Sequence, residues 1–206
     1  GLSFSGEEII EFAAAKLELR DGRAVVTQEA DEFIRRRDDR RLSPRITELT
    51  GITDEMLLED GISKQAFAAL LAELLDGETM IVAYNAQFDL LFLYYFLSNY
   101  GDARLLKDKP KLDLLTVYRD RRPFPHKLCN AIENYHLQDK VHNSHRAIDD
   151  VRATVEVMRA MEDELPDLDK YIDLFGYSAK YGVSGPRISS IRYLPQGYEP
   201  KGKLYD

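Results

Sequence analysis

The chain of 206 residues is long enough for one α/β domain with an appendage. Apolar residues make up 44% of it and charged residues 31%, and the net charge is −8. A protein that grips nucleic acid by its backbone usually carries a basic excess, so this balance speaks against a tight, processive binder. It does not exclude an enzyme that holds only a few nucleotides.

The single cysteine, Cys129, excludes an internal disulfide framework and suits a reducing compartment. The most apolar stretch, residues 80–97, contains Asn85, Gln87 and Asp89 and is too polar to cross a bilayer. The sequence does not open on a basic segment followed by an apolar run. These features predict a cytoplasmic protein without a membrane partner.

The first part of the chain predicts a β-hairpin followed by short helices. Residues 9–19 are apolar at many positions, Asp21-Gly22 signals a turn, and residues 24–27 resume a strand-like pattern. Capping side chains then predict three helix starts. These starts lie at Ser43-Pro44, Thr53 and Ser63, and the first helix is expected to stop at Gly51 and the third before Gly77.

Further along, strands alternate with helices, which favours a mixed sheet with helices on its faces. We expect a fully buried strand at 79–83 and an almost entirely apolar, buried helix from Asn85 to Gly101. The remaining expected elements are a strand or strand-to-helix passage at 111–118, a short helix at 128–135 and a long helix at 143–164. We place Ala147, Ile148, Val151, Val155 and Met158 on the inner side of the long helix, and Pro166 ends it.

From Gly176 onward, Gly, Pro and Tyr become frequent, with Lys and Arg between them. Aromatic residues interleaved with basic ones could stack bases and hold phosphates. A tail that packs against the domain is the favoured alternative. Basic runs lie at 35–37, 40–41 and 119–122 and could likewise hold phosphates. For each run taken alone, a solvated loop or face is the favoured interpretation.

The segment HRAIDD at residues 145–150 is the strongest local signal. If Ser144 caps the helix, His145 lies at its exposed start, where it can take a proton from water near neutral pH. Asp150 lies at the margin of the apolar face, where a carboxylate can face a cleft and hold a cation. The alternative is a plain helix start whose acidic residues complement the helix dipole.

The segment YNAQFDLLF at residues 84–92 is the second signal. Asp89 falls in the first turn of an apolar helix, directly after a buried strand, and a carboxylate near a core is costly without a partner or a metal. Asn85 could be a helix cap or an active-site polar group. Asp89 could also be only a partner of the helix dipole.

Together, the two segments resemble the DEDDh family of 3′–5′ exonucleases. This family includes the proofreading epsilon subunit of bacterial DNA polymerase III and the exonuclease domain of polC-type polymerases. Its second acidic motif, N-x-x-F-D, and its third, H-x-A-x-x-D, both have matches in the chain. These matches are Asn85, Phe88 and Asp89, and then His145, Ala147 and Asp150. Residues 46–53 also resemble a family segment near the nucleotide-binding cleft, and the resemblance covers about residues 1–160.

The resemblance implies a ribonuclease H-like α/β fold and hydrolysis with two divalent cations, Mg²⁺ or Mn²⁺. It assigns His145 as the catalytic base and Asp89 and Asp150 as metal ligands. It implies contacts with the substrate for Asn85, Phe88, Thr50 and Ile52.

The family's first motif, D-x-E on the opening strand, has no match, because Gly1-Leu2-Ser3 resembles the family residues that come just after this motif. Either the sequence begins late, which is favoured, or a variant has lost the motif. We therefore expect a mixed sheet that lacks its first strand, and little metal binding or hydrolysis by the chain as given. We expect an N-terminally incomplete exonuclease domain at 1–165 and a C-terminal extension at 166–206.

Three hypotheses about function remain open. The first is a proofreading or repair-type exonuclease that trims the 3′ end of single-stranded DNA, with a DNA polymerase as a candidate partner. The second is a catalytically inactive module that binds nucleic acid or a polymerase. The third keeps the chemistry but takes short RNA, because discrimination by the 2′-hydroxyl depends on the shape of the cleft.

Overall fold

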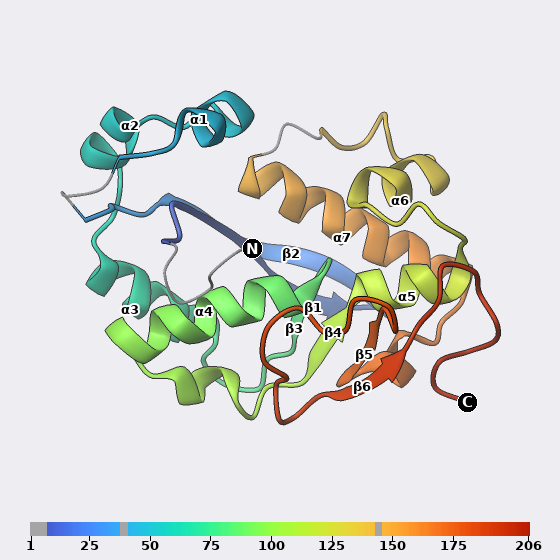
Figure 1. The fold of residues 1–206 in the computed structure, drawn as a ribbon. Coiled ribbons are helices and arrows are strands. Elements are labelled where there is room, and N and C mark those ends of the chain that lie inside the picture. The colour runs from blue at the N-terminus through green and yellow to red at the C-terminus, as the bar shows by residue number, and fades with distance from the viewer. Residues whose placement is uncertain (1–7, 38–40, 143–145) are drawn as a thin grey trace.

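The structure is a computed structural model that describes residues 8–37, 41–142 and 146–206. A hairpin is followed by short helices, then by β3, α4 and β4, further helices and a last pair of strands (Figure 1). The strands are β1 (Glu11–Arg20), β2 (Arg23–Phe33), β3 (Ile81–Ala83), β4 (Lys111–Asp113), β5 (Leu174–Tyr177) and β6 (Arg192–Pro195). The helices are α1 (Pro44–Thr50), α2 (Asp54–Glu59), α3 (Lys64–Leu74), α4 (Ala86–Tyr100), α5 (Leu114–Arg121), α6 (Leu128–Asn134) and α7 (Ala147–Glu164), with short 3₁₀ turns η1 (Ala103–Leu106) and η2 (Leu168–Tyr171).

The strands form three two-stranded sheets, one antiparallel and two parallel. β1 and β2 make the predicted hairpin, and both Asp21 and Gly22 at its turn have positive φ, which a tight hairpin turn requires. β2 continues to Phe33, beyond the predicted end at Thr27. Within the described ranges, no strand hydrogen-bonds the hairpin to the β3–β4 pair. The expected mixed α/β arrangement is confirmed.

Helices pack on these sheets as the alternation of elements predicted. α7 packs against β1 and β2, whereas α4 packs against β3 and β4 (Figure 1). Thr53 Oγ1 accepts from the Met56 amide at 3.2 Å and Ser63 Oγ from the Ala66 amide at 3.1 Å, so both predicted caps are confirmed. Ser43 precedes Pro44 as predicted, but its side chain makes no cap bond, so this part of the prediction is wrong.

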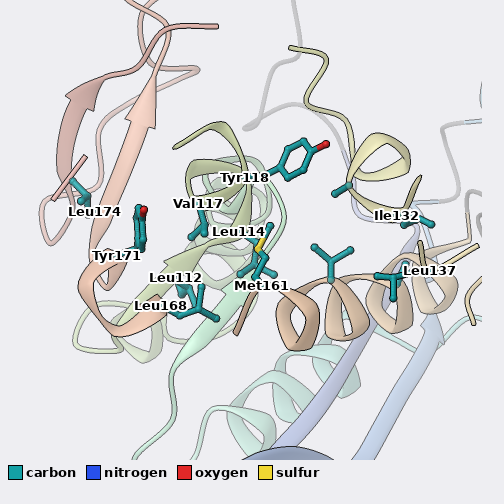
Figure 2. Packing of buried hydrophobic residues seen from close by; sticks show 13 residues of the cluster. Leu112, Leu114, Val117, Tyr118, Ile132, Leu137, Met161, Leu168, Tyr171 and Leu174 are labelled. Carbon is teal, nitrogen blue, oxygen red and sulfur yellow. The ribbon is translucent and has the colours of Figure 1, made fainter. Parts of the chain in front are cut away.

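One hydrophobic core joins the middle of the chain to its C-terminal part. Leu112 of β4 and Val117 of α5 pack in the same cluster as Met161 of α7, and Leu168 and Leu174 belong to it as well (Figure 2). Residues of the tail beyond 176, among them Leu194 and Leu204, pack against this cluster, so the tail packs against the domain, as the favoured interpretation held. The boundary at residue 165 stays a prediction.

Three burial predictions are wrong in part. The strand expected at 79–83 is shorter, Ile81–Ala83, and it is only half-buried. α4 is not buried all round, and Phe88, Tyr94 and Tyr100 are 37%, 49% and 38% exposed. Of the residues expected on the inner side of α7, only two are fully buried, since the buried stripe is displaced along the helix. The buried residues of α7 are Ile148, Ala153, Val155, Val157 and Met161.

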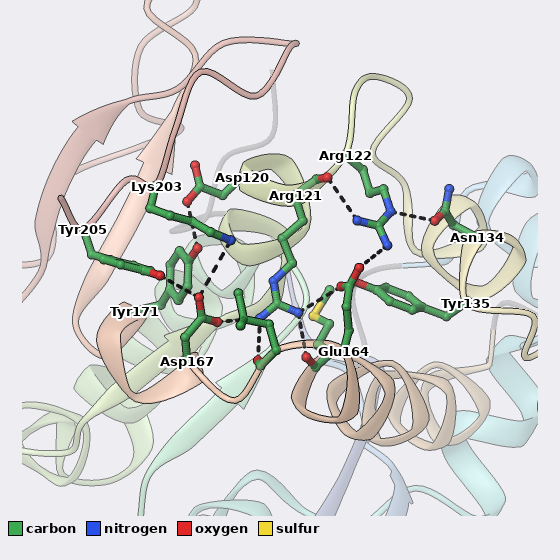
Figure 3. A network of polar contacts seen from close by, with 12 residues as sticks. Asp120, Arg121, Arg122, Asn134, Tyr135, Glu164, Asp167, Tyr171, Lys203 and Tyr205 are labelled. Carbon is green, nitrogen blue, oxygen red and sulfur yellow. Dashed lines mark hydrogen bonds and ion pairs between the residues drawn. The ribbon is translucent and has the colours of Figure 1, made fainter.

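Arg121, the last residue of α5, anchors the C-terminal end of α7 (Figure 3). Its side chain is only 3% exposed. The guanidinium donates to the carbonyl oxygens of Met161 and Leu165, and it forms ion pairs with Glu164 at 3.1 Å and Asp167 at 2.5 Å. The interpretation of this basic run as a solvated face is therefore wrong for Arg121, because four acceptors surround it.

Arg122 extends the same network. It forms an ion pair with Glu164, and its Nε donates to Asn134 Oδ1 at 2.8 Å (Figure 3).

Among the helices of the described chain, none is long and apolar enough to span a membrane.

Candidate active site

The carboxyl ends of β3 and β4 lie side by side, because the two strands are parallel and Ala83 is opposite Asp113. Polar residues follow both strands at this edge. Asp113 Oδ1 accepts from the backbone amides of Asn85 at 2.9 Å and Ala86 at 3.0 Å. Asn85 adopts a left-handed conformation with φ of 70°, which asparagine tolerates better than most residues. Asp113 therefore fixes the turn through which α4 begins.

Asp113, not Asn85, supplies the cap of α4. The Asn85 side chain makes no cap hydrogen bond and is exposed. Asp113 also accepts from the Leu115 amide and from both the amide and the hydroxyl of Thr116. Burial raises the pKa of Asp113, while these hydrogen bonds act in the opposite direction. Because five donors occupy its oxygens, Asp113 is a structural carboxylate and is not available to a metal ion.

Asp89 lies one turn into α4 and faces a different environment. The residue retains contact with solvent, but the atoms packed around its carboxyl group withdraw water from it. This desolvation, together with the smaller effect of the negative charges of Asp113 and Asp150, raises the pKa of Asp89 to about 7. Asp89 and Asp150, which are 61 residues apart in the sequence, are thus close enough in space to repel each other.

Glu11 of β1 positions the first turn of α7, which carries Asp150. Its Oε2 accepts from the Ala147 amide at 3.1 Å, and its Oε1 from Arg146 Nε at 2.7 Å. The carboxylate therefore caps an exposed helix start and pairs with the residue beside it. Asp149, on the outer side of the same turn, lies 3.9 Å from Arg152.

The remaining predicted site residues differ in their exposure to solvent and in their contacts. Phe88 is partly exposed at the start of α4, with its ring 4.9 Å from that of Phe92. Ile52 is completely buried, and Thr50 Oγ1 donates to the Ile46 carbonyl at 2.8 Å. His145 lies outside the described residues. The structure thus brings Asn85, Asp89 and Asp150 to one region, and it occupies Thr50 and Ile52 with local packing.

The exonuclease family RNase_T matches the sequence over residues 1–158. The chain belongs to this exonuclease family. Among its relatives, the PolC-type DNA polymerase III of Clostridium perfringens is 32% identical over 160 residues, which are 77% of this chain and 10% of that protein. The PolC-type DNA polymerase III of Bacillus subtilis is 32% identical over 198 residues, which are 93% of this chain and 13% of that protein. The chain thus spans about a tenth of the length of these curated relatives.

Solved exonucleases share the fold of this RNase_T domain. Escherichia coli exonuclease I in complex with a dT13 oligonucleotide superimposes with a TM-score of 0.70 and 22% identity, over 83% of this chain and 40% of that chain. Exonuclease X in complex with 5′ overhanging duplex DNA gives a TM-score of 0.52 at 17% identity, over 83% of this chain and 87% of that chain. At this identity the likeness concerns the fold, and it confirms the ribonuclease H-like class.

The donor set of this RNase_T domain suits a hard divalent cation in part. Carboxylate oxygens are the ligands that Mg²⁺ and Mn²⁺ prefer, and a cation between Asp89 and Asp150 would relieve their repulsion. The described ranges contain no cluster of three or more His, Cys, Asp or Glu residues that could hold a metal ion. Asp89 and Asp150 are therefore the candidate ligands that the described part of the domain contributes.

Two adjoining cavities lie beside Asn85, and sequence reasoning missed them. Their volumes are about 420 and 240 Å³. Asn85, Leu115, Arg119 and Tyr198 line both, so they form one continuous depression, here called the Arg119 groove. The tail supplies a large part of its wall, which no local pattern in the sequence could reveal.

Gln87 was also missed, although it lies inside the second motif. It is buried, and its Nε2 donates to the carbonyl oxygens of Ser184 and Pro186. Its Oε1 accepts from the Tyr193 hydroxyl at 2.6 Å. Gln87 thus ties the first turn of α4 to the tail.

Proposed function

We propose that the protein is a 3′–5′ exonuclease that hydrolyses the terminal phosphodiester of single-stranded DNA. The observation that supports this most directly is the proximity of two like charges, Asp89 and Asp150, at the start of α4 and α7. A carboxylate whose pKa is raised near a second negative charge is typical of functional sites. The relatives named PolC-type DNA polymerase III and the exonuclease I complex with dT13 point to DNA as substrate.

Under this proposal, Asp89 and Asp150 hold two divalent cations, Mg²⁺ or Mn²⁺, together with further ligands. The cations would supply Lewis-acid stabilisation of the charge that develops on the phosphate oxygens. His145 accepts the proton of the attacking water. Asn85 and Phe88 contact the terminal nucleotide, and Asp113 keeps Asn85 in place through the backbone. Thr50 and Ile52 support the nucleotide site from α1 and the turn after it.

A role in replication or repair, with a DNA polymerase as partner, extends the same proposal. It is supported by the relatives, in which a matching segment forms about a tenth of a DNA polymerase. Co-purification with a replicative polymerase from the source cells would test it.

One observation favours a second candidate, a catalytically inactive module that binds nucleic acid. Only two carboxylates, Asp89 and Asp150, come together as candidate ligands in the described ranges, and two cations need more. The two candidates differ in one measurable property, which is hydrolysis that depends on added metal.

The test follows the shortening of a 5′-labelled single-stranded DNA with Mg²⁺ or Mn²⁺. It uses the protein with any residues that its gene encodes ahead of Gly1. Loss of a group that only orients a metal ligand costs about 10–100-fold, so Asp89→Asn or Asp150→Asn should cost at least about 100-fold. His145→Ala should cost about 10²–10⁴-fold.

Asp149→Asn is the matched control, because it removes a neighbouring carboxylate that lies beside Arg152. Its rate should stay close to that of the unmodified protein. An RNA strand of the same length should be cut more slowly. Binding without any metal-dependent hydrolysis would overturn the nuclease proposal and favour the inactive module.

A further inference from the structure

We propose that the Arg119 groove binds the nucleotides that precede the 3′ end of a single strand. The inference rests on the proposed function, and it concerns a surface that lies beside the carboxylates. Asn85 lines both cavities of the groove and precedes Asp89 by four residues on the same turn and helix. A strand whose last phosphodiester lies at Asp89 would therefore have its next nucleotides at the entrance of the groove.

One arginine, Arg119, lines both cavities of the groove. Arg119 is half-buried, and it forms no hydrogen bond or ion pair with any residue of the described ranges. Two residues further along, Arg121 is fully engaged by carbonyl oxygens and carboxylates. A guanidinium at the wall of a groove that is open to solvent is available to a ligand that brings a negative charge. A phosphate oxygen is such a ligand, since Arg binds phosphate with two parallel hydrogen bonds.

Aromatic rings at the rim supply surfaces on which bases can stack. Phe124 is 63% exposed and Tyr198 is 49% exposed, and their ring centroids lie 5.5 Å apart. The Phe124 amide donates to the Tyr198 carbonyl at 2.9 Å, so the backbone holds both rings in place. Lys127, also exposed, adds a second positive charge to the lining. Basic residues between exposed rings are typical of surfaces that bind single strands without sequence preference.

The size of the groove suits this ligand. The larger cavity, about 420 Å³, is within the range of about 300–1,000 Å³ that is typical of small-ligand sites. The smaller cavity adds about 240 Å³ and exposes Tyr181, which is 70% accessible to solvent. The tail thus contributes Tyr181 and Tyr198 to the nucleic-acid surface while it also packs on the core.

Fluorescence anisotropy with a labelled oligothymidine of about 12 nucleotides, in a chelator that prevents hydrolysis, tests the groove directly. Phe124→Ala and Tyr198→Ala should each weaken binding by about fivefold or more, because one stacked base contributes about 1–3 kcal/mol. Arg119→Gln should make the plot of log K against log salt less steep by about 0.7, the contribution of one phosphate contact in single strands.

Two kinds of control isolate the groove. Tyr94→Ala and Arg104→Ala remove an exposed ring on α4 and an exposed charge on η1, and they should leave the affinity unchanged. An abasic strand of the same length keeps its phosphates but has no bases, so Tyr198→Ala should not weaken its binding. Thermal unfolding midpoints equal to that of the unmodified protein show that the variants are folded.

Hydrolysis of thymidine 5′-(p-nitrophenyl phosphate), which is too short to reach the groove, separates this inference from the proposed function. The groove variants should cleave it normally, while Asp150→Asn should not. Unchanged oligothymidine affinity in all three groove variants overturns the inference, even if the ester is cleaved. If the variants bind oligothymidine weakly but no protein cleaves the ester, the groove stands and the nuclease proposal fails.

Discussion

At the C-terminal end of α7, Glu164 lies between two arginines, whereas at the N-terminal end Asp150 lies near a second carboxylate, Asp89. Burial opposes ionisation of Glu164, but hydrogen bonds from Arg122 and Tyr135 outweigh it and lower its pKa. At the other end, desolvation and like charge raise the pKa of Asp89 to about 7. Arginines thus hold the carboxylate at the C-terminal end of α7, whereas Asp150 at the N-terminal end lies near a second acidic residue.

The comparison separates a carboxylate that arginines hold in the fold from a carboxylate that lies near a like charge. Asp113 shows that burial alone does not make this distinction, because it is more buried than Asp89 but has five protein donors. The useful criterion is whether protein donors already form hydrogen bonds with the carboxylate oxygens. If the criterion holds, changes at the C-terminal end of α7 will reduce stability, and changes at the N-terminal end will reduce activity.

The largest effect on stability is expected for Arg121→Ala. It would leave the carboxylates of Glu164 and Asp167 without their buried partner and free two backbone carbonyls. Breaking a buried pair by removing one partner costs about 3–5 kcal/mol. The free energy of unfolding, measured by urea titration, should fall by that amount.

Arg104→Ala is the control for this change, because it removes an arginine whose ion pair with Asp102 is exposed. Its urea midpoint should not change. At a temperature where Arg121→Ala remains folded, its nuclease rate should stay near normal. A loss of rate without a loss of stability would show that the two ends of α7 are not separable.

A smaller effect on stability, but a larger effect on rate, is expected for Glu11→Ala. The change removes the acceptor for the Ala147 amide and the partner of Arg146. Hydrogen bonds to charged groups contribute about 1.5–3 kcal/mol, so unfolding should become easier by about that amount. Because Asp150 lies in the same turn, the nuclease rate of the folded variant should fall, and Glu11→Gln should recover part of it. Equal rates for all three proteins would remove Glu11 from the positioning of the site.

The sequence alone was sufficient to predict most helices and strands and the location of the second motif. The caps at Thr53 and Ser63 and the hairpin turn at Asp21-Gly22 depend on local chemistry, so local patterns predict them. The proximity of Asp89 and Asp150 was predicted only through the family resemblance. The spacing of residues along the chain does not predict which helix starts lie close together in the fold.

The features that the sequence could not show depend on contacts between distant segments. Arg119, Arg121 and Arg122 belong to one basic run, but one lines a groove and two are held by α6, α7 or the segment after α7. The side chains that hold Arg121 and Arg122 come from residues 12 to 46 positions further along the chain. Gln87 likewise looks like an ordinary helix residue until the tail is placed upon it.

The stability that the C-terminal end of α7 contributes should also depend on pH. Burial acts against ionisation of Asp167, but hydrogen bonds from Tyr205 and Arg121 outweigh it, so its folded-state pKa lies below 3.8. A depressed pKa contributes stability that is present above the unfolded value and is lost as the pH falls through the folded value. Urea midpoints should therefore drop between about pH 5 and about pH 2 by more in the unmodified protein than in Asp167→Asn. A parallel drop in both proteins would exclude Asp167 as a source of acid sensitivity.

The smallest effect is expected midway along α7, where Arg152 reaches across to Glu29 of β2. The pair is bidentate, with Nε at 3.0 Å and Nη2 at 2.7 Å from the carboxylate, but the Arg152 side chain is 55% exposed. Exposed pairs gain little because water screens them and both side chains lose freedom. Arg152→Ala should leave the urea midpoint within error, and a double-mutant cycle with Glu29→Ala should give almost no coupling at low or high salt. A strong coupling that salt weakens would contradict this expectation and would show that an exposed ion pair can stabilise the packing of α7 on β2.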